Sequence, residues 1–299
     1  MNIQFLGTAA AEGVPAVFCR CEMCEYARKA GGREIRTRAG AIIDGRLKLD
    51  FGPDSYHHML THGLRFADVH SVLVTHSHSD HFSPLELEFR SPVYSDIRED
   101  EPPMTIYGNE AVGALAEPYL RAGRHRLAFR KMTPFEPVEI EGYRVTALEA
   151  VHCTGGNEKR YPVEFMGRTL YRTEDALFYL VEKGASSILY AHDTCEFSRP
   201  DMEFLAGKKL GLISLDCTGG SRHSFDYTHW AGHMSADGCL RMRDKLLRIG
   251  AADGHTVFVA SHFSHNGCAP FETLRAALPG FVIACDGMQI NTPCRKEGV

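Results

Sequence analysis

The sequence has no apolar run long enough to cross a lipid bilayer, which takes about 20 consecutive residues. Its first stretch, MNIQFLGTAAAEGVPAV, also lacks the basic start of an export signal, and Glu12 and two glycines interrupt it. This stretch predicts a first strand followed by a loop. We therefore expect a cytoplasmic protein with no membrane partner.

Internal repeats, low-complexity tracts and a recognisable interdomain linker are also missing from the 299 residues. A chain of this length forms one large domain or two modest ones. Because no linker is visible, we expect a single domain over residues 1–299. Two segments, near 89–103 and 154–173, are rich in charge, proline or glycine and are predicted to be loop insertions near the functional site.

An excess of positive charge is missing too, since 33 Lys and Arg stand against 38 Asp and Glu, a formal net charge of -5. Proteins that coat nucleic acid present a basic surface, so this balance argues against a nucleic-acid partner. Histidine is abundant, with 16 residues, many of them in short clusters of the kind that bind metals. Ten cysteines in a chain without an export signal favour metal ligation over disulfides.

Short apolar strands alternate with amphipathic segments along the chain, which predicts the α/β class. Helix-like segments cover 54–63, 109–122, 201–206, 235–249 and 270–278. Several strands end in a polar or acidic residue followed by a loop: LVTHSHSDH, LEAVH, LYAHD, ISLD and VASH. Layered α/β folds place their chemistry at such strand ends, because the sheet is rigid and the loops vary.

The segment THSHSDHF, residues 75–82, carries the strongest chemical signal in the sequence. His76 and His78 lie two apart after an apolar strand, and Asp80 and His81 follow directly. Four such side chains do not fit comfortably around one metal, but in a tight loop two can face one metal and two its neighbour. The alternative is a solvated polar turn, against which four ligand-type residues in six positions argue.

His76-x-His78-x-Asp80-His81 resembles the metal-binding motif of the metallo-β-lactamase superfamily. The resemblance implies an α/β fold in four layers, an αββα sandwich of two mixed sheets with helices outside. It also implies a dinuclear metal centre at one edge of the sandwich.

The same resemblance requires three later ligands, a His, a bridging Asp and a last His, each at the end of a strand. The segments EAVHCT, YAHDTC and VASHFS supply them as His152, Asp193 and His262. The ligand sets implied are His76, His78 and His152 for one metal and Asp80, His81 and His262 for the other, with Asp193 bridging both.

These residue types suit the implied chemistry. Two divalent ions about 3.5–4 Å apart can share a water, lower its pKa and present hydroxide to a substrate. Neutral imidazoles hold such ions without overloading the site with charge, and a bridging carboxylate sets their separation. We expect manganese or zinc in the two positions, with iron as a further option, and we expect Asp80 to be catalytic as well as a ligand.

Three thiols crowd into the segment FCRCEMCEYA, at Cys19, Cys21 and Cys24. A zinc ion bound by three thiolates in a closed structural site needs a fourth ligand, and His265 in SHFSHNG could supply it. Such a zinc would join the first loop of the chain to the last ligand loop. The alternative is three small buried residues and an ordinary loop histidine, while the odd count and the compartment argue against a disulfide.

The pairing of C-x-C-x2-C near the start with S-H-x-S-H near the end resembles PhnP-like phosphodiesterases of the carbon–phosphorus lyase pathway type. The segments FLGTAAAEGVPAVFCRC, LDC and GFVIACDGMQI resemble the same family. This resemblance implies that Cys19, Cys21, Cys24 and His265 form a structural zinc site. It further implies hydrolysis of cyclic phosphates and other phosphodiesters, often with manganese, and it allows a homodimer.

A second catalytic residue is expected in GHMS, where PhnP-like chains place a histidine near the metals. His233 holds this position and could stabilise phosphoryl oxygens or protonate a leaving alkoxide. A histidine that only packs beside a helix start is the alternative. His229 and His223 are weaker candidates for the same role.

Other functions share parts of this pattern. An RNA-processing nuclease of the same superfamily would use the same metal motif, although the acidic charge argues against it. A PqqB-like protein, which binds a metal or a small molecule without hydrolysis, has its own three-cysteine cluster near the start. Its active-site motif departs from HxHxDH, which this sequence keeps, and this favours the metal-dependent hydrolase.

The residues next to the predicted ligands are expected to pack in the interior or to support a ligand. His192, Cys153 and Cys195 adjoin ligands in sequence and should point to the opposite face, as packing groups or as support for a ligand. Asp216 and Asp286 could each orient a ligand imidazole or satisfy loop amides. The arginines of GREIRTRAG could face a phosphate or solvent.

Overall fold

The structure is a computed structural model of the whole chain. It describes residues 1–98, 100–124, 126–152, 175–221, 232–267 and 269–293, together with the backbone of 161–165 and 168–172. Within these ranges, no helix has the length and apolar character that a membrane span requires.

The first of two seven-stranded sheets is built mainly from the N-terminal half of the chain. Its strands, in spatial order, are β16 (Gln289–Asn291), β1 (Asn2–Gly7), β2 (Gly40–Ile43), β3 (Leu47–Leu49), β4 (Ser71–Leu73), β5 (Met104–Gly108) and β6 (Leu127–Lys131). The strands from β16 to β3 pair antiparallel, and those from β3 to β6 pair parallel. The sheet is therefore mixed, as the sequence predicted.

The second sheet holds the later strands. In spatial order they are β15 (Phe281–Ile283), β14 (Val257–Ser261), β13 (Leu212–Asp216), β12 (Ser186–Ala191), β11 (Leu177–Lys183), β8 (Tyr143–Glu149) and β7 (Pro137–Ile140). The strands β12 to β15 run parallel. A separate hairpin joins β9 (Tyr161–Phe165) to β10 (Arg168–Arg172).

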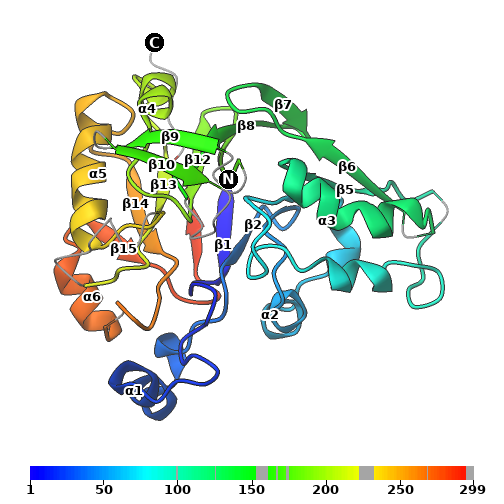
Figure 1. Cartoon of the computed structure of the whole chain (residues 1–299), viewed down its shortest axis with the longest axis horizontal. Coiled ribbons are helices and arrows are strands. Elements are labelled where there is room, and N and C mark those ends of the chain that lie inside the picture. The colour runs from blue at the N-terminus through cyan, green and yellow to red at the C-terminus, as the bar shows by residue number, and fades with distance from the viewer. Residues whose placement is uncertain are drawn as a thin grey trace.

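The two sheets pack face to face over one core and carry helices on their outer faces, which confirms the four-layer αββα sandwich (Figure 1). The inner core joins apolar side chains from both sheets, such as Phe5 and Leu49 with Val145 and Tyr179. Two further cores lie under the helices, one on each outer face. Figure 1 shows α4, α5 and α6 on one side, and α2 and α3 on the other.

The helices begin and end where local chemistry permits. They are α1 (Glu22–Ala30), α2 (Ser55–His62), α3 (Glu110–Arg121), α4 (Arg199–Leu205), α5 (Ala236–Arg248) and α6 (Phe271–Ala277), with short 3-10 helices η1 (Gly32–Glu34), η2 (Phe66–Asp68) and η3 (Pro84–Phe89). The Asn109 side chain caps α3 by accepting from the Val112 amide at 2.9 Å. Ser198 and Asp201 form a capping box at α4. Each helix except α1 matches a predicted segment to within two residues.

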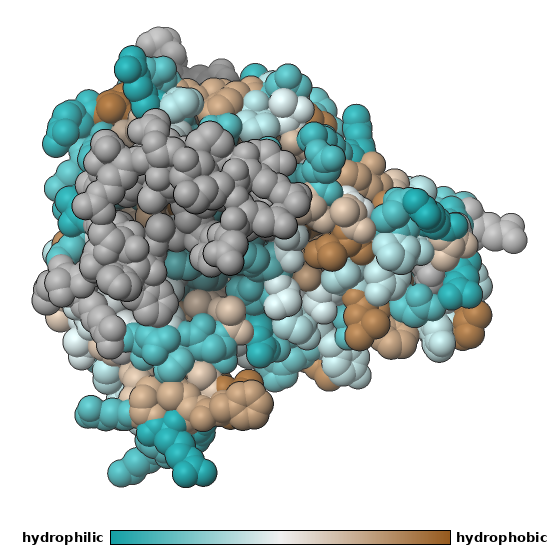
Figure 2. Space-filling view, in the orientation of Figure 1, coloured by the Kyte–Doolittle hydropathy of each residue, from teal (hydrophilic) through white to brown (hydrophobic). Residues whose placement is uncertain are grey.

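Between η3 and β5, the predicted insertion at 89–103 has irregular backbone in the residues that the structure describes. Its residues Phe89, Ile97 and Glu101 line, together with Phe51 and Phe66, a separate and mostly apolar pocket of about 340 Å³ beside α2. Figure 2 shows apolar residues as separate patches over the lobe that carries α2 and α3. The predicted insertion at 154–173 contains the β9–β10 hairpin, and the rest of it lies outside the described residues.

The parallel register of the second sheet brings three predicted strand ends to one edge. Ala191 pairs with Leu215 across β12 and β13, and Asp216 pairs with Ser261 across β13 and β14. The residues that follow these strands therefore emerge side by side. Two of them, Asp193 and His262, adopt positive φ values of 50° and 63°, a conformation that non-glycine residues rarely adopt and that clusters at functional sites.

Candidate metal centre

The first ligand group forms where the loop after β4 meets the ends of β8 and β12. The His76 Nε2 atom lies 3.2 Å from the Asp193 Oδ2 atom, and the His152 Nε2 atom lies 3.2 Å from the His78 Nδ1 atom. One ligand atom from each of these four residues falls within 4.8 Å of the others, so the group could hold one metal ion. His76, His152 and Asp193 are buried.

The second ligand group shares Asp193 with the first. The His81 Nε2 atom lies 2.8 Å from the Asp193 Oδ2 atom, 3.2 Å from the Asp80 Oδ2 atom and 3.3 Å from the His262 Nε2 atom. These four residues are all buried and also fit one metal ion. The structure thus gathers the seven predicted side chains into two adjoining groups with the predicted membership.

The polar atoms of the two ligand groups are arranged to bind metal ions rather than to form hydrogen bonds with one another. The buried His76 Nε2 and Asp193 Oδ1 atoms make no hydrogen bond to any described residue. Burial alone raises the pKa of Asp193, but the His262, His81 and His152 imidazoles outweigh burial and hold its pKa well below the usual value. An anionic carboxylate surrounded by imidazoles is a donor set that suits two divalent ions.

Behind the second group, Asp50 holds a ligand imidazole in place. It follows β3, is fully buried and contacts the His81 Nδ1 atom at 2.8 Å, while it accepts hydrogen bonds from the amide and hydroxyl of Thr75. Burial raises the pKa of Asp50, but the facing His81 outweighs this effect and lowers the pKa. The contact fixes the His81 ring so that its Nε2 atom faces Asp193. Asp50 was not among the residues predicted from the sequence, although LKLDFG is also an apolar strand that ends in an acid.

We expect Asp50→Asn to weaken the second metal position selectively. The amide cannot provide the negative charge that orients and polarises the His81 imidazole, so the affinity for the second metal should fall by about 10–100-fold. Calorimetric titration of metal-free protein with Mn²⁺ measures this affinity. Asp201→Asn, at a buried aspartate that caps α4, is the matched control. Equal affinities in wild type and Asp50→Asn would contradict the assigned role.

Asp216 organises the loops around His262 and His233. Its carboxylate accepts hydrogen bonds from the backbone amides of Asp193, Thr218 and Met234 at 3.0–3.1 Å. The Asp216 Oδ2 atom also lies 3.2 Å from His262 Nδ1 and 3.1 Å from His233 Nδ1. Asp216 therefore fills both roles that the sequence allowed for it, since it satisfies loop amides and contacts the imidazoles of His262 and His233.

His233 lies beside both ligand groups. Its Nδ1 atom is 3.3 Å from Asp193 Oδ1, and its ring centroid lies 5.2 Å from that of His152. Cys195 anchors its loop by accepting a hydrogen bond from the Gly232 amide at 3.0 Å. Burial lowers the pKa of His233, but Asp216 and Asp193 outweigh burial and raise it to about 9. A partly exposed imidazole beside two carboxylates, which favour its protonated form, therefore borders the centre.

A separate cluster joins the N-terminal loop to the loop after β14. The His265 Nδ1 atom lies 3.4 Å from the Cys19 Sγ atom and 3.5 Å from the Cys21 Sγ atom. Tetrahedral zinc with ordinary Zn–S and Zn–N bond lengths places such atoms about 3.6 Å apart. With Cys24 included, the four ligand atoms lie within 4.8 Å of one another, so Cys19, Cys21, Cys24 and His265 could hold a zinc ion.

The thiols of this cluster have divergent acidities. Burial raises the pKa of Cys21, but the Cys24 amide and the His265 side chain outweigh burial and lower it to about 6. Burial raises the pKa of Cys24 to about 12. The Cys21 thiolate beside an imidazole would attract a cation, which would deprotonate the Cys24 thiol as it binds.

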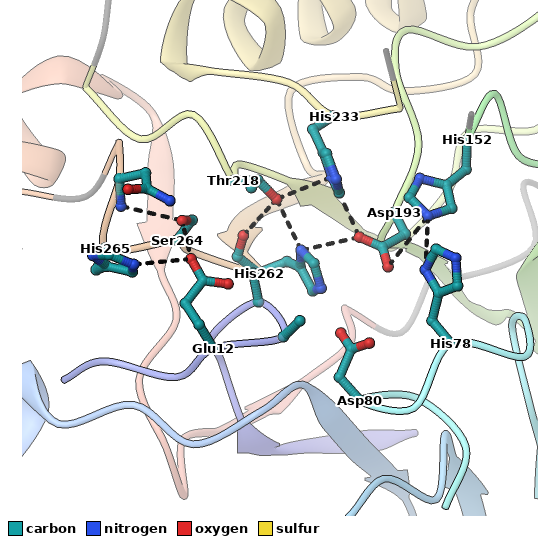
Figure 3. Close-up of a pocket in the computed structure, with 13 residues that line it drawn as sticks. Glu12, His78, Asp80, His152, Asp193, Thr218, His233, His262, Ser264 and His265 are labelled. Carbon is teal, nitrogen blue, oxygen red and sulfur yellow. Dashed lines mark hydrogen bonds and ion pairs between the residues drawn. The ribbon is translucent and has the colours of Figure 1, made fainter. Parts of the chain in front are cut away.

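The two ligand groups open onto a pocket of about 470 Å³, and of the cysteine cluster His265 alone lines it (Figure 3). His78, Asp80, His152 and Asp193 line its inner part, and His233 borders it on the side of α5. Figure 3 places His265 at the opposite end of the pocket from His78 and His152. A substrate bound at the two ligand groups would therefore extend toward the cysteine cluster or toward the solvent.

Asp286 and His192 take roles that the sequence allowed for them. The carboxylate of Asp286 accepts hydrogen bonds from Thr8 and Thr37, so it satisfies loop groups. The buried His192 contacts the Ser214 hydroxyl at 2.8 Å, and its ring centroid lies 5.9 Å from that of His262. His223, His229 and Cys153 lie outside the described residues.

The arginines of GREIRTRAG do not line the pocket, and Arg33 faces solvent, with 48% of its side chain exposed. Arg36 is buried, donates to the Thr8 hydroxyl at 2.9 Å and stacks over the Phe263 ring at 4.5 Å. Arg33 pairs with Glu272, and Arg38 pairs with Asp54. The two roles proposed for this segment from the sequence are therefore both wrong for Arg36.

Comparison with known proteins agrees with this geometry. Residues 46–263 match the family described as Beta-lactamase superfamily domain. Coenzyme PQQ synthesis protein B of Methylorubrum extorquens is 31% identical over 125 residues, which is 38% of each chain. Ribonuclease Z of Leuconostoc mesenteroides is 28% identical over 143 residues, covering 47% of this chain and 38% of that protein. The chain thus spans 38% of the length of these curated relatives.

Solved structures match over nearly the whole chain. A diphosphatase described as new in the PhnP family superposes with a TM-score of 0.70 at 21% identity and covers 99% of both chains. Zn²⁺-bound PqqB from Methylobacterium extorquens superposes with a TM-score of 0.71 at 20% identity, covering 97% of this chain and 100% of that one. The family match over most of the chain shows that the protein belongs to the β-lactamase superfamily, and its fold is the metallo-β-lactamase sandwich.

Proposed function

We propose that the protein is a metal-dependent phosphodiesterase that acts on a small phosphodiester, cyclic phosphates included. The observation that carries this proposal is the pair of ligand groups that share Asp193, with the His233 imidazole beside them at the edge of one pocket. The centre would hold two divalent ions, manganese or zinc. The cysteine cluster would hold one zinc that acts on structure alone.

When bound, two adjacent divalent ions supply an attacking nucleophile from water and neutralise charge on phosphoryl oxygens. The chain's own residues fix where this happens. Asp193 belongs to both ligand groups and so sets their separation. Asp50 and Asp216 hold the imidazoles of His81 and His262 in orientation. The buried setting strengthens each of these electrostatic contacts.

His233 would act on the leaving group. Asp193, Asp216 and Thr218 all approach its Nδ1 atom, within 3.1–3.3 Å, which leaves the Nε2 atom for a substrate. A phosphodiester releases an alkoxide, which needs a proton as the bond to phosphorus breaks. A proton donated from Nε2 to that oxygen completes the cleavage.

We expect His233→Ala to affect substrates according to their leaving groups. Loss of a general acid should lower kcat/KM for a 2′,3′-cyclic nucleoside phosphate by about 10²–10⁴-fold. The loss should be much smaller for bis(p-nitrophenyl) phosphate, since p-nitrophenolate leaves without a proton. Steady-state kinetics on both substrates, with metal content measured in parallel, provides the test. An equal loss on both substrates at full metal content would contradict the proton-donor role.

Two relatives have names that indicate other functions, and we favour the phosphodiesterase over both. Ribonuclease Z cuts RNA, as its name states, but this chain has a net charge of -5, unlike a protein that holds nucleic acid by its basic surface. Coenzyme PQQ synthesis protein B takes its name from coenzyme synthesis. Two complete ligand groups favour hydrolysis over binding alone.

The proposal is tested by hydrolysis of bis(p-nitrophenyl) phosphate and of a 2′,3′-cyclic phosphate after metal-free protein has been supplied with Mn²⁺ or Zn²⁺. Turnover that depends on the added metal supports it. A total lack of turnover with either metal would overturn it.

A further inference from the structure

The N-terminal loop is fastened to the last ligand loop beside the centre. The Phe263 amide donates to the Thr8 carbonyl at 2.9 Å, and the Ala10 amide donates to the Phe263 carbonyl at 3.0 Å. A turn closed by the Gly13 amide and the Ala10 carbonyl then places Glu12 at the pocket. Gly13 has a φ of 73°, which favours glycine there. The position of Glu12 is thus fixed by backbone contacts.

One oxygen of the Glu12 carboxylate is held and the other is not. The Ser264 hydroxyl donates to the Oε1 atom of Glu12, and His265 Nε2 lies 3.6 Å from the same oxygen. The Asn266 amide in turn donates to the Ser264 hydroxyl at 3.1 Å. All contacts of Glu12 with described residues run through Oε1. Figure 3 shows the carboxylate between His265 and the centre, with its second oxygen turned toward Asp80.

A role in orienting His265, the candidate zinc ligand, does not explain the position of the Glu12 carboxylate. A separation of 3.6 Å between Glu12 and His265 is longer than a hydrogen bond, so the carboxylate orients the His265 ring weakly. The side chain of Glu12 also keeps 30% of its surface exposed, on the pocket side. A fixed hydrogen-bond acceptor that faces the pocket can bind a donor group of the substrate.

We propose that Glu12 is a specificity-determining residue, which accepts a hydrogen bond from a hydroxyl on the substrate's alcohol group and disfavours a second anionic group there. This inference rests on the phosphodiesterase function proposed above. The phosphate would lie at the two ligand groups, and the alcohol group that stays on phosphorus would extend past His262 toward Glu12.

The chemistry of the surrounding side chains favours a hydroxyl. A carboxylate only accepts hydrogen bonds, so a neutral donor pairs with it and an anion is repelled. Asn266 lines the same end of the pocket and provides an amide for a second hydroxyl. A quaternary ammonium ligand is recognised by aromatic faces, and the described lining offers imidazoles, carboxylates and small side chains instead.

The test uses three diesters that release the same p-nitrophenolate and differ in the retained group: propyl, 2,3-dihydroxypropyl and 2-carboxyethyl. Wild-type protein should prefer the dihydroxypropyl diester to the propyl diester by about 10-fold or more in kcat/KM, the range of one hydrogen bond to a charged group. It should turn over the carboxyethyl diester more slowly than the propyl diester. Glu12→Gln should lower kcat/KM for the dihydroxypropyl diester, raise it for the carboxyethyl diester and reduce the preference for dihydroxypropyl over propyl to about threefold or less.

Glu25→Gln, at an exposed glutamate of α1 outside the pocket, is the matched control and should keep the wild-type preferences. Calorimetric binding of glycerol 1-phosphate and of propyl phosphate measures the same preference if Glu12→Gln loses turnover, and zinc content shows whether the cysteine cluster is intact. An equal preference in wild type and Glu12→Gln, or none in wild type, would overturn the role of Glu12 alone. A lack of turnover of all three diesters by wild-type protein would overturn the phosphodiesterase proposal and this inference with it.

Discussion

Asp193→Asn should remove both metal ions of the centre and nearly all hydrolysis, because Asp193 is the residue that the two ligand groups share. The substitution keeps the shape of the side chain but removes the negative charge between two cations. Metal content should fall from about three to about one ion per chain. Phosphodiester hydrolysis should fall by at least about 10³-fold, since adjacent metals contribute several kcal/mol to such a reaction.

Asp286→Asn is the matched control for this experiment. Asp286 is another aspartate in the interior, but it accepts hydrogen bonds from Thr8 and Thr37 and approaches neither ligand group. Its substitution should leave three metals per chain and should cost some stability only. Retention of two metals in the centre by Asp193→Asn would refute the shared-ligand assignment.

Cys21→Ser should release the zinc and destabilise the whole chain. The zinc would tie the segment 19–24 to His265, at opposite ends of the sequence, so its binding free energy adds to the folding free energy. We expect the free energy of unfolding to fall by at least about 3 kcal/mol, and the melting temperature by about 6–12 °C. Calorimetric melting with metal analysis measures both quantities.

Cys285→Ser provides the comparison for Cys21→Ser. Cys285 is also a half-buried free cysteine, but it lies outside the cluster. Its substitution should leave the zinc content unchanged and move the melting temperature far less. If the two variants lose the same stability and neither loses zinc, the cysteine cluster is not a metal site.

The structure brings the predicted ligand residues together, and each sequence signal that pointed to them is local. The HxHxDH spacing, the strand ends before Asp193 and His262, and the close cysteines are all visible without the fold. The contacts among them are not local. The His81 Nε2 atom meets His262 at 3.3 Å only because the two sheets pack face to face. The order of the ligands came from the family resemblance, and the geometry agrees with it.

The elements and residues that the sequence did not predict depend on tertiary contacts, or they coincide with another sequence signal. The strands β6 and β7, LAFRK and PVEI, are mostly half-buried or exposed and lack a continuous apolar run. The helix α1 begins within the cysteine segment and includes Cys24. The spacing of the cysteines predicts a metal site there, and this signal hides the start of the helix. Asp50 was missed because its partner His81 adjoins it only through packing of β3 against the loop after β4.

Glu12 illustrates the same limit. In the sequence it appears only as an interruption of the first apolar stretch. Its contact with Ser264 joins positions far apart along the chain, and it places a carboxylate in a pocket that would bind an anion. A carboxylate in such a pocket weakens the binding of an anionic substrate by charge repulsion. Selection among substrates is a use for this repulsion.

One chain should carry a dinuclear centre and a separate zinc. Plasma mass spectrometry of wild type and of Cys21→Ser measures the metal content per chain. We expect about three metals in wild type, and about two in Cys21→Ser with zinc as the metal lost. One metal or none in wild type, or the same content in both proteins, would contradict it.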